Sequence, residues 1–255
     1  MEPIIQMINV FKTFGKQQVL KGVNLSLYEG KTTVIVGESG QGKSSILKHI
    51  LGLVKPDKGK IIVYGKDINK ISSKELKDIR ANFGVLFQNS ALFDSMTVFD
   101  NVALPLRERT NKSEEEIKEI VNEKLEMMDI HDSNDKYPAQ LSGGMRKRVG
   151  LARALVLNPK IVFFDEPTTG LDVALSNEMY RVFFRTQTAL KYTALIVSHD
   201  VPKIFKLADY VALMHNGIIQ DSLPPEDFQT SENPVIRAFV EKTMGRIYES
   251  EKVEG

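Results

Sequence analysis

The sequence contains no cysteine, which excludes a framework of disulfide bonds. It contains no apolar run near the ~20 residues that a membrane-spanning helix needs. The N-terminus also lacks the basic segment and continuous apolar segment of a secretory signal peptide. These absences predict a soluble protein of a reducing compartment, the cytosol.

A surplus of charge is absent as well. Lys and Arg number 34 and Asp and Glu number 33, which leaves a formal net charge of +1. No basic excess therefore indicates nucleic acid as the partner. Hydrophobic residues make up 42% of the 255 residues, which is enough for one large domain with a sizeable core.

Several stretches have the pattern of β-strands. Val23, Leu25 and Leu27 alternate with polar residues, and this predicts a half-buried strand in an antiparallel N-terminal region. A second short strand is predicted within 60–68, and Asn216-Gly217 predicts a tight hairpin. Continuous apolar runs predict strands buried on both faces of a parallel sheet, namely TTVIVG, FGVLFQ, IVFFDE and ALIVSH.

The stretch between the second and third of these runs favours helices. Ser113 and Glu116 form a capping box, and apolar residues recur at helical spacing in the residues that follow. Another apolar stripe begins at Met145 and stops before Asn158-Pro159. We therefore predict a helical lobe at about residues 89–157, inserted into an α/β core.

The C-terminal end is predicted to be polar after Ile236 and frayed. The spacing of Val235, Phe239 and Met244 is nevertheless amphipathic. That spacing fits packing on the same subunit or against a neighbouring copy, and the sequence leaves both open.

The motif GESGQGKSS fits the pattern of a phosphate-binding loop, because an apolar run precedes it and a helical pattern follows. Its glycines let backbone N–H groups turn toward a phosphate, and the helix N-terminus adds partial positive charge. Lys43 is expected to neutralise the β- and γ-phosphates, and the Ser44 hydroxyl to bind Mg²⁺. The predicted ATP-binding residues are Gly37, Glu38, Ser39, Gly40, Gln41, Gly42, Lys43, Ser44 and Ser45.

Polar residues at the ends of the other runs complete the predicted site. Asp165 is expected to hold Mg²⁺ and Glu166 to orient or deprotonate the attacking water, although both could cap the next helix. His199 is placed to contact the γ-phosphate, and Gln88 to reach Mg²⁺ or the water. Phe14 could stack on adenine or belong to the core.

A second glycine turn, LSGG, precedes a basic helix. Ser142 can cap that helix, and Gly143 and Gly144 expose amides at its positive end, which makes another anion site. Because this turn lies in the helical lobe, we do not expect it to reach its own phosphate loop. In a two-fold dimer it would close over the ATP of the partner.

With these motifs in this order, residues 4–240 resemble the ATPases of ATP-binding cassette (ABC) transporters. The motifs that carry the resemblance are Phe14, GESGQGKSS, Gln88, LSGGM, IVFFDE, Gly170-Leu171-Asp172 and His199. The resemblance implies a P-loop NTPase α/β core with a mainly parallel sheet, an N-terminal antiparallel β subdomain and an inserted helical subdomain. It implies one ATPase domain at 1–240 and a tail at 241–255.

The same resemblance implies a head-to-tail homodimer that sandwiches ATP and Mg²⁺. Residues meeting the nucleotide of the other subunit would be Ser142, Gly143, Gly144, Met145 and Asp172. Met145 departs from the glutamine that most members carry there. DNA-repair and chromosome-organising relatives need long coiled coils between the nucleotide motifs, and the sequence has none.

Residues 91–108, ALFDSMTVFDNVALPLRE, resemble the Mce/Mla-type lipid-transport ATPases, which also commonly read LSGGM. This implies ATP-driven phospholipid trafficking between inner and outer membranes, from the cytoplasmic face of the inner membrane. Implied partners are a membrane permease docking near 88–99, an Mce-domain protein and accessory subunits. The alternative is the ATPase of another small-substrate or lipoprotein-release transporter. Leu92, Phe93 and Phe99 could also simply pack the lobe, which is compatible with docking.

Overall fold

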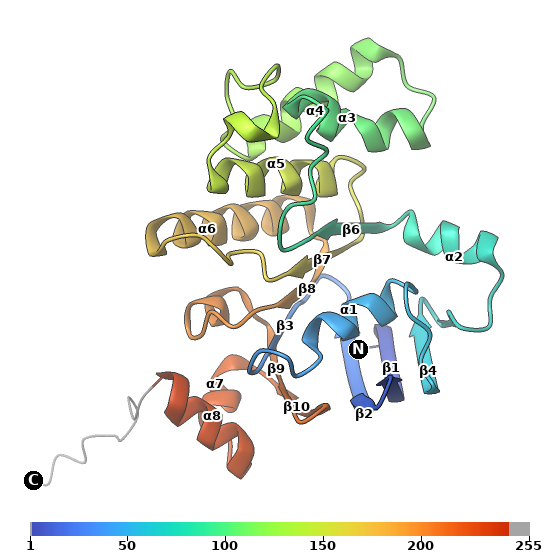
Figure 1. Ribbon diagram of the computed structural model, residues 1–255, viewed down its shortest axis with the longest axis vertical. Helices are drawn as coiled ribbons and strands as arrows, with labels where there is room; N and C mark the ends of the chain where they lie inside the picture. The colour runs from blue at the N-terminus through green and yellow to red at the C-terminus, as the bar shows by residue number, and fades with distance from the viewer. Residues whose placement is uncertain (1, 245–255) are drawn as a thin grey trace, which may run out of the picture.

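The computed structural model describes residues 2–244, whose strands form two sheets (Figure 1). The larger sheet has the order β10 (Ile218–Leu223), β9 (Tyr210–His215), β3 (Thr32–Val36), β8 (Thr193–Val197), β7 (Ile161–Asp165) and β6 (Phe83–Leu86). Its neighbours pair in parallel except β9 and β10, which form the hairpin predicted at Asn216-Gly217. The four apolar runs are thus confirmed as strands of a parallel sheet.

Burial on both faces explains why these runs do not alternate with polar residues. Val34 of β3 packs in one hydrophobic cluster, and its neighbour Ile35 packs in the other. Phe163 and Phe164 of β7 divide between the two clusters in the same way. Successive side chains of a strand point to opposite faces, so both faces of this sheet are covered.

The smaller sheet is antiparallel, with the order β2 (Gln17–Tyr28), β1 (Pro3–Phe14), β4 (Lys58–Val63) and β5 (Lys66–Asp67). The predicted alternation in β2 is confirmed, because Val23, Leu25 and Leu27 are buried. The single strand predicted at 60–68 is wrong. Tyr64 and Gly65 have φ angles of 48° and 75°, so the chain turns there and pairs β4 with β5 as a hairpin.

The helices are α1 (Lys43–Ile50), α2 (Ser73–Arg80), α3 (Val98–Arg109), α4 (Glu114–Met127), α5 (Gly143–Leu155), α6 (Val173–Leu190), α7 (Pro225–Gln229) and α8 (Pro234–Met244), with 3₁₀ turns η1 (Pro138–Gln140) and η2 (Lys203–Leu207). The predicted capping box of Ser113 and Glu116 starts α4. Between β6 and β7 the chain forms α3, α4 and α5, which lie together at the top of Figure 1. This is the helical insertion that the sequence predicts.

The prediction of a polar end after Ile236 is wrong as far as Met244. Ile236, Val240 and Met244 are buried in α8, and the ring of Phe239 lies 6.4 Å from that of Phe228 in α7. α8 therefore packs on its own chain, which is the first of the two alternatives that the sequence leaves open. The remaining residues of the predicted tail, 245–255, lie outside the described part of the chain.

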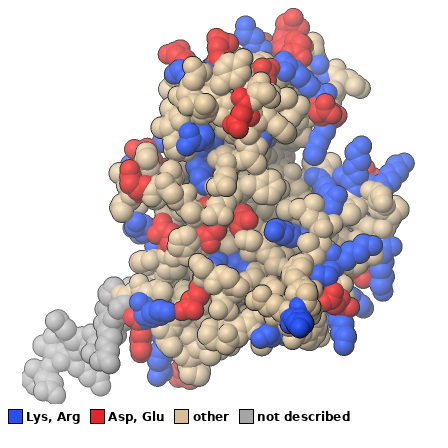
Figure 2. Space-filling view, in the orientation of Figure 1, with Lys and Arg blue, Asp and Glu red and all other residues tan. Residues whose placement is uncertain are grey.

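The balanced net charge is an average over an uneven surface. Figure 2 shows basic side chains gathered on the right-hand side, where Figure 1 places β4 and α2, while acidic and basic side chains mix over the helices at the top. Within residues 2–244, the structure has no helix with the length and apolar character needed to cross a membrane.

Candidate functional site

The loop after β3 takes a conformation that only its glycines allow. Gly37 has a φ of 147°, and a Cβ there would lie 2.3 Å from the backbone oxygen of Met214. Gly42 has a φ of 103° and caps the start of α1, where a Cβ would lie 2.8 Å from a methyl group of Val19. The loop can therefore wrap closely over the N-terminus of α1, with backbone amides free to face an anion.

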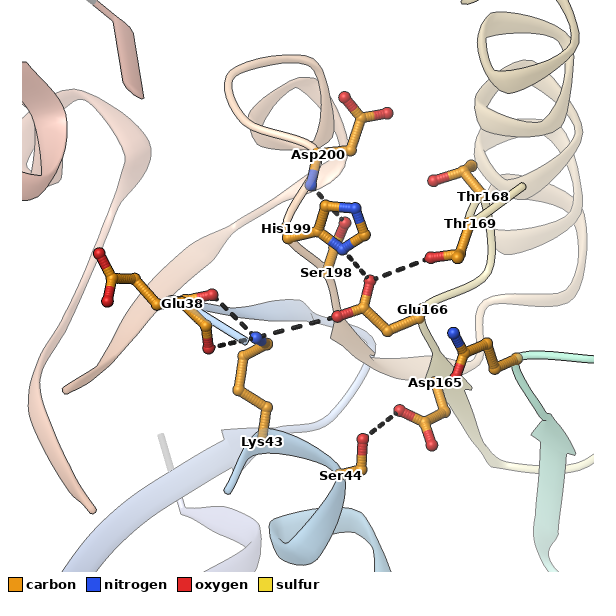
Figure 3. A network of polar contacts seen from close by, with 12 residues as sticks. Glu38, Lys43, Ser44, Asp165, Glu166, Thr168, Thr169, Ser198, His199 and Asp200 are labelled. Atoms are coloured by element: carbon orange, nitrogen blue, oxygen red, sulfur yellow. Dashed lines mark hydrogen bonds and ion pairs between the residues drawn. The ribbon is translucent and has the colours of Figure 1, made fainter. Parts of the chain in front are cut away.

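Lys43 is the first residue of α1, and its ammonium group is held inside this loop (Figure 3). Nζ donates hydrogen bonds to the carbonyl oxygens of Gly37 and Glu38 at 2.8 and 2.9 Å, and lies 3.9 Å from Glu166 Oε1. Burial lowers the pKa of Lys43, and the nearby Glu166 and Asp165 carboxylates oppose that change. The side chain is thus a cation positioned where the loop would wrap a phosphate group.

Ser44 and Asp165 bring two oxygen ligands together. The Ser44 hydroxyl donates to Asp165 Oδ1 at 2.7 Å, which joins the start of α1 to the end of β7. Mg²⁺ prefers oxygen ligands and typically takes one or two carboxylates together with substrate phosphates. The described residues contain no cluster of three or more acidic, His or Cys side chains that could hold a metal ion alone. These two residues therefore fit a Mg²⁺ ion that arrives with a nucleotide. The ion would offset the negative charge of the nucleotide phosphates.

Glu166 and His199 meet at the ends of adjacent strands. His199 Nδ1 lies 2.5 Å from Glu166 Oε2, Thr169 Oγ1 donates to the same oxygen at 3.3 Å, and Figure 3 shows both contacts. Because an ionised carboxylate only accepts hydrogen bonds, we assign the proton to Nδ1. Glu166 has a φ of 49°, an uncommon backbone conformation of the kind that clusters at functional sites, and its N–H donates to the carbonyl of Val197 at 2.9 Å.

Lys43, Ser44, Glu166 and His199 border a single cleft of about 470 Å³, which is in the size range of ligand sites, while Asp165 lies behind Ser44 and does not line it. Its lining residues are Ser39, Gly40, Gly42, Lys43, Ser44, Ser45, Gln88, Glu166, Thr169 and His199. Sequence reasoning named all of these except Thr169. A cation, helix-terminal amides, a carboxylate and a histidine around one space can bind a polyphosphate and direct a water at it.

Other residues predicted for this site point elsewhere. The Glu38 carboxylate pairs with Lys242 of α8, and Gln41 Oε1 accepts a hydrogen bond from the backbone of Asn216 at 2.6 Å. Phe14 lies at the end of β1, 46% exposed, with Lys12 Nζ 5.6 Å from its ring centre. Phe14 is therefore not part of the core, and its stacking on adenine stays a prediction.

The second glycine turn starts α5, and none of its residues lines the cleft. The Ser142 hydroxyl accepts a hydrogen bond from the Met145 amide at 3.2 Å and so caps the helix, while the Met145 side chain packs against the core. Asp172 caps α6 by accepting from the Leu175 amide at 2.8 Å. Gly144 packs beside Leu175, so the turn and the Asp172 segment lie together, apart from the phosphate loop.

Two residues that sequence reasoning missed connect α5 to the segment after β6. Lys147 Nζ donates to the carbonyl of Gln88, and Arg153 Nη2 donates to that of Ser90 at 2.7 Å. Burial lowers the pKa of both side chains. The available signal was the presence of these two basic residues among the many apolar positions of α5.

Asn101 is a further residue that sequence reasoning missed. It is completely buried in α3, where it accepts from the Phe93 amide at 2.8 Å and donates to the carbonyls of Phe93, Met96 and Thr97. The feature of the sequence that could have identified Asn101 is a polar amide side chain among the apolar positions of a predicted helix. The contacts of Asn101 fix the turn at 93–97.

Comparison with known proteins identifies the family. The profile described as ABC transporter matches residues 20–169. The probable ribonucleotide transport ATP-binding protein mkl of Mycobacterium leprae is 42% identical over 236 residues, which are 92% of this chain and 68% of that protein. The intermembrane phospholipid transport system ATP-binding protein MlaF of Haemophilus influenzae is 39% identical over 211 residues, 83% of this chain and 80% of that protein.

Solved structures agree with the sequence relatives. cbiO1 from Clostridium perfringens, part of the ABC transporter complex cbiONQ, superposes with a TM-score of 0.82 and 30% identity over 97% of this chain and 98% of its own. The ATP-binding cassette MJ0796, a dimer bound to ADP and Pi, gives 0.79 and 31% over 87% of this chain and 98% of its own. This chain therefore belongs to the ABC transporter family, as one of the subunits that bind ATP with Mg²⁺ and hydrolyse it.

Proposed function

We propose that this chain powers phospholipid trafficking between the inner and outer membranes as the ATPase of an Mla/Mce-type transporter. The observation that carries this proposal is the segment at 91–108 together with LSGGM, because both resemble that subfamily. The similarity to MlaF supports it, since the match covers 80% of that protein. We place the chain at the cytoplasmic face of the inner membrane, as one domain at 1–240 with a tail at 241–255.

In the proposed reaction, Lys43 and the amides of residues 37–45 bind the phosphates of ATP. Ser44, Asp165 and Gln88 hold Mg²⁺, which supplies positive charge to the phosphates. Glu166 orients the attacking water or accepts its proton, and His199 contacts the γ-phosphate. The contact of His199 with Glu166 supports a shared role at the transferred group.

We propose that a second copy of the chain completes the ATP-binding site. Ser142, Gly143, Gly144 and Met145 present the N-terminus of α5, and Asp172 lies beside them. Since none of these residues lines its own cleft, they are available to a partner's ATP. The dimeric form of the related cassette MJ0796 supports this arrangement.

The permease is proposed to dock on the segment from Gln88 to Phe99. Phe93 is 50% exposed and Phe87, directly before this segment, is 42% exposed, so two large apolar side chains are available to a partner. Asn101 fixes the turn that presents Phe93, so the surface is preformed. Lys147 and Arg153 join this surface to α5, which would carry a docking movement to the second glycine turn.

A second candidate is the ATPase of an importer for a small solute. The relatives include the methionine import protein MetN of Carboxydothermus hydrogenoformans, 38% identical over 235 residues. The mycobacterial mkl proteins, named for ribonucleotide transport, are 42% identical. The chain spans about two thirds of their length.

Affinity purification from gently solubilised membranes separates the two candidates. The tagged chain and its untagged control are compared by mass spectrometry of the proteins and lipids that co-purify. We expect a permease, an Mce-domain protein and phospholipid. A permease with a soluble solute-binding protein and no lipid would replace the lipid proposal by the importer and leave the ATPase chemistry unchanged.

A further inference from the structure

We infer that the hydroxyl of Tyr180 positions the loop that carries His199 against the loop that carries Glu166. The inference rests on the proposed roles of these two residues in ATP hydrolysis. Tyr180 touches neither of them. It acts through Thr168, which follows Glu166 by two positions, and through Asp200, which follows His199 directly.

The hydrogen bonds form a continuous bridge. Tyr180 OH donates to Asp200 Oδ2 at 2.6 Å, and its oxygen lies 3.1 Å from Thr168 Oγ1. Burial and the Asp200 carboxylate raise the pKa of Tyr180, so the hydroxyl stays protonated and donates. With Tyr180 donating to Asp200, the remaining role of its oxygen is to accept from Thr168. Tyr180 comes from α6, outside both loops.

Apart from this bridge, few hydrogen bonds join the two loops beyond the sheet. The Glu166 amide bonds to Val197 and continues the β7–β8 ladder by one residue. Beyond that, the contact of His199 with Glu166 is made between side chains. Figure 3 shows that the Asp200 carboxylate points away from His199, so the bridge holds the loop from its other side.

A role in packing alone would need only the ring. The Tyr180 ring lies 6.3 Å from that of Phe183 and belongs to the core, and the residue is 7% exposed. A hydroxyl placed there would be costly without partners, and this one has two. Replacement of Tyr180 by Phe keeps the ring and removes only the bridge.

The same helix region offers a matched control. Tyr192 is also buried, and its hydroxyl bonds Thr186 Oγ1 at 2.9 Å. It lines no part of the cleft, and its hydrogen bonds go to Thr186, Gln187 and Phe183, which lie outside both loops. Tyr192→Phe therefore removes the same atom from a comparable environment without touching the proposed bridge.

The test is single-turnover hydrolysis of MgATP by the purified chain, with ATP affinity and melting temperature measured in parallel. We expect Tyr180→Phe to slow hydrolysis about 10-fold and to leave ATP affinity within about two-fold, because one charge-assisted hydrogen bond that orients the site is lost. Tyr192→Phe should hydrolyse at the wild-type rate, with a similar loss of melting temperature. Thr168→Val breaks the other end of the bridge and should slow hydrolysis without altering the Tyr180 ring.

Asp200→Ala tests whether Tyr180 acts through Asp200, because it removes the oxygen that accepts the hydrogen bond. The double variant of Tyr180→Phe and Asp200→Ala should be no slower than the slower single variant, because both changes break one bridge. Equal rates for Tyr180→Phe and Tyr192→Phe, or multiplied losses in the double variant, would overturn the inference. Glu166→Gln distinguishes failure of this inference from failure of the proposed function. Full turnover in that variant would show that Glu166 does not have its proposed role in hydrolysis, whatever the Tyr180 variants do.

Discussion

A substitution at Glu166 tests the proposed chemistry of ATP hydrolysis most directly at the level of single residues. The Glu166 carboxylate is the acceptor for His199 and Thr169 and lies beside the Lys43 ammonium. Glu166→Gln keeps the shape of the side chain and removes the base, so turnover should fall by about 100-fold or more. ATP affinity should remain, because the phosphate loop is unchanged.

That variant is measured by steady-state ATP turnover, by equilibrium ATP binding and by size in solution with MgATP. We expect ATP to hold the variant as a closed dimer, since hydrolysis no longer opens it. Glu178→Gln, a change at an exposed residue that pairs with Arg148, serves as the control. Turnover of Glu166→Gln within a few-fold of wild type would contradict the assignment.

His49 makes stability depend on pH. It is completely buried in α1, with Nδ1 2.7 Å from the carbonyl of Ser45 and no partner at Nε2 among the described residues. Burial lowers the pKa of His49 below its ordinary value of 6.5. The unfolded chain therefore takes up the proton first as pH falls, and the free energy of unfolding declines below about pH 6.5.

Urea denaturation at about pH 7.5 and about pH 5.5 measures this decline. Wild type should lose more stability between the two pH values than His49→Gln, which cannot be protonated. The exposed His131→Gln should retain the wild-type dependence. An equal decline in wild type and His49→Gln would assign the pH dependence to other groups.

The residues of the phosphate loop and the strand ends were predictable because their chemistry is encoded by short local motifs. Lys43, Asp165, Glu166 and His199 each follow an apolar run whose strand direction places them at one sheet edge. Tyr180 could not be predicted in this way. Its partners lie 12 and 20 positions away, and only the packed fold brings the hydroxyl between them.

At the scale of elements, the turn at 93–97 depends on one buried amide of α3. Asn101→Ala would leave the Phe93 amide and several carbonyls without a partner, so unfolding should become easier by about 2 kcal/mol. The turn that presents Phe93 should also loosen. Capture of the permease by the tagged chain is then expected to weaken while ATP affinity stays the same.

Urea denaturation, ATP binding and co-purification measure these effects separately. Asn111→Ala, at an exposed position after α3, is the control and should match wild type. Unchanged permease capture by a folded Asn101→Ala variant would show that docking does not use this turn.

The strands of the small sheet show where sequence patterns fail at this scale. β1 was not predicted, because its pairing with β2 carries register shifts and Asn9 adopts a φ of 48°, which interrupts the alternation of apolar residues. The sequence predicts one strand where the structure has the hairpin of β4 and β5, since the turn at Tyr64-Gly65 lacks the usual Asn-Gly or Asp-Gly pair. Regular strands such as β3 and β7 have neither irregularity and were predicted.

At the scale of the whole molecule, the two glycine turns are separate within one chain. The cleft is lined by residues from the phosphate loop and the strand ends, whereas Ser142 caps a helix of the inserted lobe. Ser142→Arg should therefore leave ATP binding within about two-fold of wild type and stop hydrolysis, because the defect would lie in the partner's site. Equilibrium ATP binding and ATP turnover are measured on the same preparation. Ser113→Arg, at an exposed position, is the control for whether such a change disturbs folding.

The measurement that tests the shared site most directly is hydrolysis by a mixture of two inactive variants. Lys43→Ala removes the phosphate-loop cation, and Ser142→Arg blocks the second glycine turn. A two-fold dimer of one copy of each holds one fully wild-type site, so equal mixing should restore about a quarter of wild-type turnover. If each variant is inactive alone and the mixture stays inactive although mixed dimers form, the two glycine turns do not build one site and the proposed head-to-tail dimer is wrong.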